Sequence, residues 1–162
     1  MDAAALTDAM TPTTVVLGTR DSQMPVLVDL ADIRGVLAIN ASGDLATAMV
    51  ASISLSLVAA PWSGGIDIVA VGEDLGWLAH TGSDDVQLAD EDEVVEGLVG
   101  FSEEASKYPG TITRVVLSSS PLDLPDQESL AAAGIVIVMP GSGVREIIVT
   151  DCDHAEFDGQ PF

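Results

Sequence analysis

Unbroken hydrophobic runs alternate with helix-length segments through most of the chain. Four runs are short enough for strands: residues 35–40, 66–71, 111–117 and 135–139. Continuous apolar strands are typical of a parallel sheet covered on both faces. Three longer segments have helical spacing or end at Pro or Gly: residues 45–60, 91–107 and 126–133. This alternation predicts a three-layer α/β fold, with a mostly parallel sheet, flanking helices and right-handed crossovers.

Short β-favouring runs joined by polar turns stand at both ends of the pattern. Residues 14–18 and 25–30 predict one hairpin, and residues 146–150 and 154–157 predict another. These hairpins would extend the sheet or form a flap. Residues 75–86 predict a loop with a short turn. We expect residues 1–13 to be a flexible leader and residues 14–162 to form a single α/β domain.

The charge and hydropathy of the chain exclude some classes of function. The chain has 162 residues, five Lys plus Arg, and 26 Asp plus Glu, which gives a net charge of −21. Hydrophobic residues make up 48%, so a packed globule is expected despite the charge. Five cations are too few to neutralise nucleic-acid phosphates or to bind an anionic membrane. We therefore expect a protein partner or adjacent domains of the same polypeptide, and the oligomeric state stays open.

The longest apolar stretch, residues 45–60, predicts a buried core helix. It is interrupted by Ser52, Ser54 and Ser56 and is shorter than the roughly 20 apolar residues of a membrane span. The one cysteine, Cys152, excludes an internal disulfide. The first residues lack the basic and apolar regions of a secretory signal. A cytoplasmic-facing soluble domain is expected, with a membrane-anchored parent protein as one context.

The turn after the strand at 35–40 is where a phosphate-binding loop would lie in such a fold. That loop has the form GxxxxGK[ST], in which amides wrap the phosphates and a lysine reaches the terminal ones. Here the turn has one glycine, Gly43, and carries Asp44 where an incoming phosphate would meet negative charge. The chain's single lysine is Lys107, far along the sequence. These residues argue against ATP binding, and more strongly against ATP hydrolysis.

Parallel sheets bind ligands beyond the carboxyl ends of their strands, which defines one candidate ligand crevice. Its residues come from two predicted turns: Asn40, Ser42, Gly43, Asp44, Thr47, Ser118, Ser119 and Ser120. The serine run lacks the G-x-S-x-G context of a hydrolase nucleophile. We expect no catalytic residue and no cofactor.

Three acidic segments carry the residue types of metal ligands, and each is better explained by a structural role. Residues 72–74 follow a strand as a charged turn. Residues 84–93 lack the calcium-loop spacing and suit a solvated helix start, although a weak divalent-cation site there stays open. In residues 151–154, strand alternation would put Cys152 and His154 on one face and Asp151 and Asp153 on the other, which favours a hairpin turn over zinc. No metal is expected.

The block at residues 25–40, its following turn, the helix at 45–60 and the strand at 66–72 resemble the nucleotide-binding core of FtsK/SpoIIIE-type translocases. The likeness implies a P-loop-like scaffold without its phosphate-binding motif. The chain is also similar to the central α/β domain of actinobacterial membrane-anchored proteins that combine LysM and bacterial transcriptional activator domains. That likeness rests on residues 26–30, Pro61-Trp62 and the closing hairpin at 147–157.

The sequence is consistent with two functions. The LysM-associated likeness implies a non-catalytic domain that serves interaction or regulation within a larger envelope-associated protein. The alternative is a small-ligand or nucleotide-sensing domain that binds at the carboxyl ends of the strands. A concave apolar pocket with convergent polar groups at that edge would favour the alternative.

Overall fold

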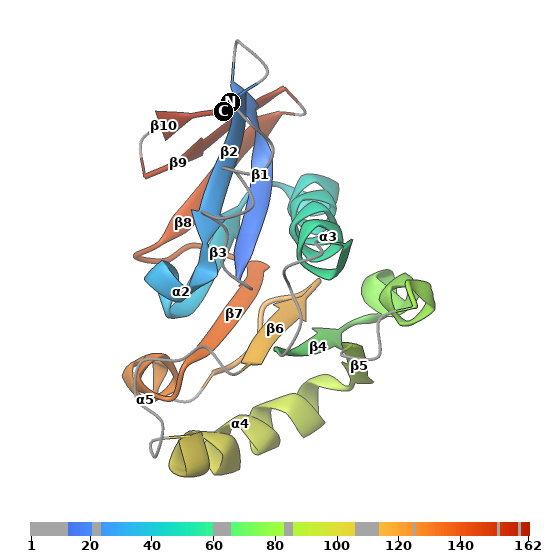
Figure 1. Cartoon of the computed structure of the whole chain (residues 1–162), viewed down its shortest axis with the longest axis vertical. Coiled ribbons are helices and arrows are strands. Elements are labelled where there is room, and N and C mark those ends of the chain that lie inside the picture. Colours follow the sequence, from blue (N-terminus) through green and yellow to red (C-terminus); the bar gives the residue numbers. More distant parts are fainter. Residues whose placement is uncertain are drawn as a thin grey trace, which may run out of the picture.

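The computed structural model describes residues 13–20, 24–59, 66–82, 86–105, 114–124, 126–151, 153–158 and 160–162. These residues form the expected α/β fold (Figure 1). One sheet of eight strands runs in the order β10-β9-β8-β3-β7-β6-β4-β5. Its strands are β3 (Gly35–Asn40), β4 (Asp67–Val71), β5 (Val86–Ala89), β6 (Arg114–Ser118), β7 (Ile135–Pro140), β8 (Glu146–Asp151), β9 (His154–Phe157) and β10 (Gln160–Pro161).

The six strands from β8 to β5 are parallel, as predicted. β3 lies between β7 and β8, and its Leu37 is opposite Val138 of β7. β8 begins opposite Ala38 and runs past the end of β3. The carboxyl edge of the sheet therefore continues into the β8–β9 hairpin, beside the turn that follows β3.

Both faces of the sheet are covered, which makes the fold three-layered (Figure 1). One face carries α3 (Gly43–Ala59), the 3₁₀ helix η1 (Glu73–His80), the short helix α2 (Leu30–Ile33) and a β1–β2 ribbon. The other face carries α4 (Glu91–Ala105) and α5 (Gln127–Ala132). Along β7, Val136 and Val138 join the first core, whereas Ile135 and Ile137 join the second. A strand buried on both faces has no polar positions, which explains the unbroken apolar runs.

The serines inside the apolar helix α3 have separate roles. The buried Ser54 Oγ donates to the Val50 carbonyl at 2.6 Å, so the hydroxyl is satisfied within the helix. Ser56 Oγ accepts from the Val16 amide of β1 at 2.7 Å. Ser52 is exposed. The helix is apolar on more than one side because the β1–β2 ribbon covers the side that the sheet does not.

The two predicted hairpins are confirmed, and they are used differently. β1 (Thr14–Arg20) and β2 (Met24–Asp29) pair antiparallel as a separate two-stranded ribbon. β8 and β9 pair antiparallel and extend the main sheet. Thr13, the last residue of the predicted leader, is buried, and its carbonyl accepts from the Leu30 amide at 3.1 Å. Residues 1–12 lie outside the described residues.

Four short elements were not predicted: α2, η1, β5 and the two-residue strand β10. α2 begins after Asp29, whose carboxylate accepts from the Ala31 amide at 2.9 Å and turns the chain out of β2. η1 occupies part of the predicted loop at 75–86, where Leu75 and Leu78 lie one 3₁₀ turn apart and are both buried. β5 is a four-residue strand at the edge of the sheet. Each is too short to produce a distinct hydrophobic period.

Candidate functional site

The turn between β3 and α3 lies at the carboxyl edge of the sheet, as predicted. Ser42 is exposed, and its carbonyl accepts from the Leu45 amide at 2.9 Å. Gly43 begins α3 with a φ of +36°, a left-handed value that glycine adopts most easily. Asp44 is exposed in the first turn of the helix, and Thr47 is half-buried one turn later.

A second carboxylate, that of Glu146 at the start of β8, lies beside the end of β3. Glu146 Oε2 accepts from Asn40 Nδ2 at 3.5 Å and from the Gly143 amide at 3.4 Å. The β7–β8 loop is held against β3 by backbone bonds, among them Gly141 N to the Ile39 carbonyl at 3.0 Å. Negative charge therefore lies on both sides of the turn, from Asp44 and from Glu146.

Replacing Asp44 with lysine should leave the fold intact. The side chain is exposed, so only its interaction with the helix dipole changes. The variant loses the favourable interaction of an acid with the helix N-terminus and gains the unfavourable interaction of a cation. Together these should lower the free energy of unfolding by about 1 kcal/mol. Urea denaturation of Asp44→Lys and the wild type measures the difference. A loss several times larger would show that Asp44 is not on an exposed turn.

The serine turn after β6 ties two strand ends together. The buried Ser118 Oγ donates to the Ser120 carbonyl at 2.7 Å and accepts from the Ser120 amide at 3.3 Å. The Ser119 amide donates to the Val71 carbonyl of β4 at 3.2 Å, and its Oγ does so at 3.5 Å. These bonds run toward β4 rather than toward the β3–α3 turn. That the two turns share one ligand crevice stays a prediction.

Ser120 lines a cavity of about 380 Å³ where β4 and β5 meet the start of α4. Its polar lining is strongly acidic: Glu73, Asp90, Glu91 and Glu93. Glu73 belongs to the segment at 72–74 and lies in the first turn of η1. In the part of the chain that the structure describes, no group of three or more His, Cys, Asp or Glu residues is placed to hold a metal ion.

The turn between β8 and β9 corrects one prediction. Alternation put Asp151 and His154 on opposite faces, but Asp151 Oδ1 lies 2.8 Å from His154 Nδ1. The same oxygen accepts from the Asp153 amide at 2.8 Å, an Asx turn. The strand register shifts between Val149 and Asp151, so the two-residue period does not continue through the turn.

This contact shifts both pKa values in opposite directions. The hydrogen bond with His154, followed by the one from the Asp153 amide, lowers the pKa of Asp151. The hydrogen bond and the charge of Asp151 raise the pKa of His154. The pair is therefore ionic over a pH range that begins above the lowered pKa of Asp151 and ends at the raised pKa of His154.

Replacing Asp151 with asparagine should lower the pKa of His154 toward its ordinary value of about 6.5. In the wild type, the contribution of His154 to stability is fully present below its unfolded pKa and is lost as the pH rises through its raised folded pKa. The contribution of Asp151 is lost as the pH falls through its lowered pKa. NMR titration of the His154 ring in both proteins measures the shift. Equal pKa values would contradict the contact.

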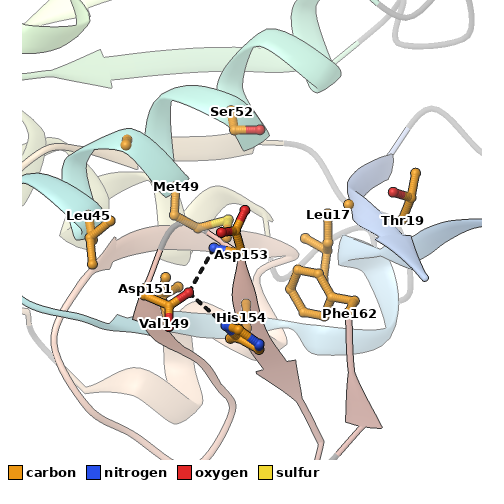
Figure 2. A pocket seen from close by; sticks show the side chains of 13 residues that line it. Leu17, Thr19, Leu45, Met49, Ser52, Val149, Asp151, Asp153, His154 and Phe162 are labelled. Carbon is orange, nitrogen blue, oxygen red and sulfur yellow. Dashed lines mark hydrogen bonds and ion pairs between the residues drawn. The ribbon is translucent and has the colours of Figure 1, made fainter. Parts of the chain in front are cut away.

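The same turn forms part of a cavity of about 420 Å³ between α3, β1 and the C-terminal segment (Figure 2). Its lining residues are Leu17, Gly18, Thr19, Leu45, Ala48, Met49, Ser52, Val149, Asp151, Asp153, His154, Ala155 and Phe162. Met49 of α3 lies on one side of the cavity, and Leu17 and Phe162 lie on another. Sequence reasoning missed this site, because its walls come from segments far apart in the chain and contain no motif.

Other residues singled out from the sequence add little to the site. Five of them lie outside the described part of the chain: Trp62, Asp84, Asp85, Lys107 and Cys152. No helix among the described residues combines the length and the apolar character needed to cross a membrane.

Solved structures share this fold. The chain is similar to the cytoplasmic domain of EssC, with a TM-score of 0.62 and 12% identity over 98% of this chain and 45% of that one. It is similar to ATPases 2 and 3 of Thermomonospora curvata EccC in complex with a signal sequence peptide, with a TM-score of 0.62 and 11% identity over 94% of this chain and 37% of that one. ATPases 2 and 3 of Geobacillus thermodenitrificans EssC give a TM-score of 0.56 and 15% identity over 99% of this chain and 43% of that one.

The chain thus spans less than half the length of each of these structures. No protein-family model and no curated protein matches it, so the likeness to LysM-associated domains stays a prediction. At these identities the comparisons establish the fold alone: this chain has an α/β fold that also occurs in the cytoplasmic domain of EssC and in ATPases 2 and 3 of EccC.

Proposed function

We propose that this chain is a non-catalytic domain with a P-loop-like fold, and that it serves interaction or regulation within a larger envelope-associated protein, on its cytoplasmic side. The observation that carries the proposal is the negative charge at the β3–α3 turn. Asp44 stands in the first turn of α3, and the Glu146 carboxylate accepts from Asn40 and Gly143 beside it.

A nucleoside triphosphate would be repelled at this turn. Phosphate sites at helix N-termini use free amides and the positive end of the helix dipole, and P-loops add a lysine. Two arginines whose side chains are described, Arg34 and Arg114, stand before β3 and at the start of β6, which is the amino edge of the sheet. Arg145 pairs with Asp158 at 3.1 Å and lies over the Phe157 ring, 5.5 Å from its centroid.

Two features support a role as a module. The chain corresponds to less than half of the EssC and EccC structures that share its fold, and two of those structures contain two ATPase domains, ATPases 2 and 3. Acidic side chains are also concentrated at the start of α4, where Asp90, Glu91, Asp92 and Glu93 are all exposed. Such a surface suits a basic partner or a basic neighbouring domain.

Calorimetric titration with Mg·ATP and Mg·GTP tests the non-catalytic part. We expect no binding heat in the titration and no phosphate release in a separate phosphate assay. An active P-loop ATPase measured in parallel shows that the two assays detect binding and hydrolysis. Micromolar binding to the wild type would contradict the proposal. An Asp44→Lys variant that gains binding would identify the acid as the obstacle.

Immunoblotting of native cells with an antibody to residues 126–158 tests the module part. We expect a band larger than 16.6 kDa that sediments with membranes. A band at 16.6 kDa that stays in the supernatant would contradict it.

A second candidate function, small-ligand sensing, is favoured by the cavity beside α3. It lies where β8 ends, at the carboxyl edge of the parallel sheet, and its walls are mostly apolar with a few polar groups. This is the arrangement that ligand sites in α/β sheets have in general. It differs from the predicted crevice, with which it shares the first turns of α3 but none of the candidate residues.

A further inference from the structure

We propose that the cavity between α3, β1 and the β8–β9 turn binds an organic ammonium group, that is, a protonated amine carried on an apolar stem. The amine belongs either to a free small molecule or to a lysine side chain of another polypeptide. This inference rests on the second candidate function, small-ligand sensing, and names the chemistry of its ligand.

The size and walls of the cavity suit the apolar stem. A volume of about 420 Å³ lies in the range of small-molecule sites, roughly 300–1,000 Å³. Leu45 and Met49 of α3, Leu17 of β1, Val149 of β8 and the Phe162 ring provide apolar surface (Figure 2). Burying such a stem releases about 25 cal/mol for each Å² of apolar area removed from water.

The charge of the lining selects a cation. Asp151, Asp153 and His154 are its titratable members, and they lie together at the β8–β9 turn. Their formal charge is −2 when the imidazole is neutral and −1 when it is protonated, so the turn is negative in both states. The lining residues from α3 and β1 are uncharged. An anion would be repelled, and a neutral ligand would gain nothing from the negative charge of the turn.

Two groups that would touch the ammonium are held in place. The Asp151 carboxylate is fixed by its bonds to His154 Nδ1 and the Asp153 amide, both at 2.8 Å. The backbone of Phe162 pairs with Ala155 in both directions, at 3.2 and 2.8 Å. Its ring lies so close to Gly18 that a Cβ there would come within 2.9 Å of it. The cavity is thus lined by an aromatic ring and by two carboxylates, and both kinds of group attract an ammonium.

The first experiment compares three probes of one shape and different charge: 2-phenylethylammonium, 2-phenylethanol and phenylacetate. Each is titrated into the ¹⁵N-labelled chain, and amide shifts of the lining residues are followed by NMR. We expect the ammonium to bind with a dissociation constant on the order of 1 mM or below. The alcohol should bind at least about tenfold more weakly, and phenylacetate should not bind. Equal binding of all three, or none of the ammonium, overturns the proposal.

Variants then locate the site. Ala48 is exposed where α3 borders the cavity, so Ala48→Trp should fill the space and abolish ammonium binding. Ala132→Trp is the matched control, because Ala132 is an exposed alanine of α5 on the opposite face of the sheet. Asp153→Asn should weaken binding about threefold or more, whereas Asp123→Asn, at an exposed loop position, should not. Retained binding in Ala48→Trp overturns the location.

A capped Leu-Lys-Leu peptide and its norleucine counterpart distinguish the two sources of the amine. Binding of the lysine peptide at least tenfold tighter than the small ammonium identifies a polypeptide source, and weaker binding identifies a small molecule. The norleucine peptide carries no charge, so we expect it not to bind in either case. Binding of the norleucine peptide would overturn the proposal. These results do not depend on whether the chain is a non-catalytic module. That proposal is tested by the Mg·ATP titration and by the immunoblot.

Discussion

Gly72→Ala is expected to lower the free energy of unfolding by about 3 kcal/mol or more. Gly72 follows β4 with φ +105° and ψ 148°, a region that is essentially limited to glycine. A Cβ at this position would lie 2.1 Å from Ser119 Oγ, so the serine turn would have to move as well. The conformational strain costs about 1–3 kcal/mol, and the steric overlap adds a similar amount. Urea denaturation measures the sum.

Two control variants separate these effects. Gly82 has a φ of +78°, and a Cβ there would meet nothing within 4 Å, so Gly82→Ala reports the conformational strain alone, about 1 kcal/mol. Adding Ser119→Ala to Gly72→Ala removes the overlapping oxygen and should recover part of the loss. If the double variant were no more stable than Gly72→Ala, the contact between Gly72 and Ser119 would not be the cause.

The result bears on the role of the serine turn. If Ser119 packs against Gly72 and bonds the Val71 carbonyl, the turn couples the ends of β4 and β6. Its hydroxyls are then part of the fold before any ligand is considered. If Gly72→Ala lowers the free energy of unfolding no more than Gly82→Ala does, the serine turn is not needed to hold these strand ends together. Its hydroxyls could then bind a ligand, as the sequence predicts.

Much of the fold could be predicted because the central strands are buried on both faces. β3 has the predicted bounds, Gly35–Asn40, and β7 differs from its predicted range by one residue. A strand with cores on both sides must be apolar throughout, and a polar turn marks each of its ends. The helices were predicted in the same way, from segments that end at polar or glycine-containing turns. α3 begins two residues before its predicted range.

The candidate site was less predictable because it depends on contacts between distant residues. The absence of a lysine in the β3–α3 turn can be read from the sequence, because residue types require no structure. The second acid could not: Glu146 and Asn40 are 106 residues apart. The cavity beside α3 likewise joins Leu17, Met49 and Phe162, which no spacing relates. The Asp151–His154 contact depends on a register shift that local alternation does not include.

Leu37→Ala is expected to lower the free energy of unfolding by about 3–4 kcal/mol, within the range of roughly 2–5 kcal/mol for replacing a buried leucine with alanine. Leu37 is fully buried in β3, opposite Val138, in the core that α3 covers. The neighbouring strands are fixed by their own hydrogen bonds, so the space can collapse only partly. Urea or thermal denaturation measures the loss.

Leu88→Ala is the matched control, because Leu88 is the same residue type on the edge strand β5 and is 51% exposed. Its expected loss is below about 1 kcal/mol. A loss in Leu37→Ala no larger than this would mean that β3 is not the covered central strand. The turn that follows β3 would then not lie at the carboxyl edge of the sheet, and the charge of Asp44 and Glu146 would not lie at that edge, which the proposed function requires.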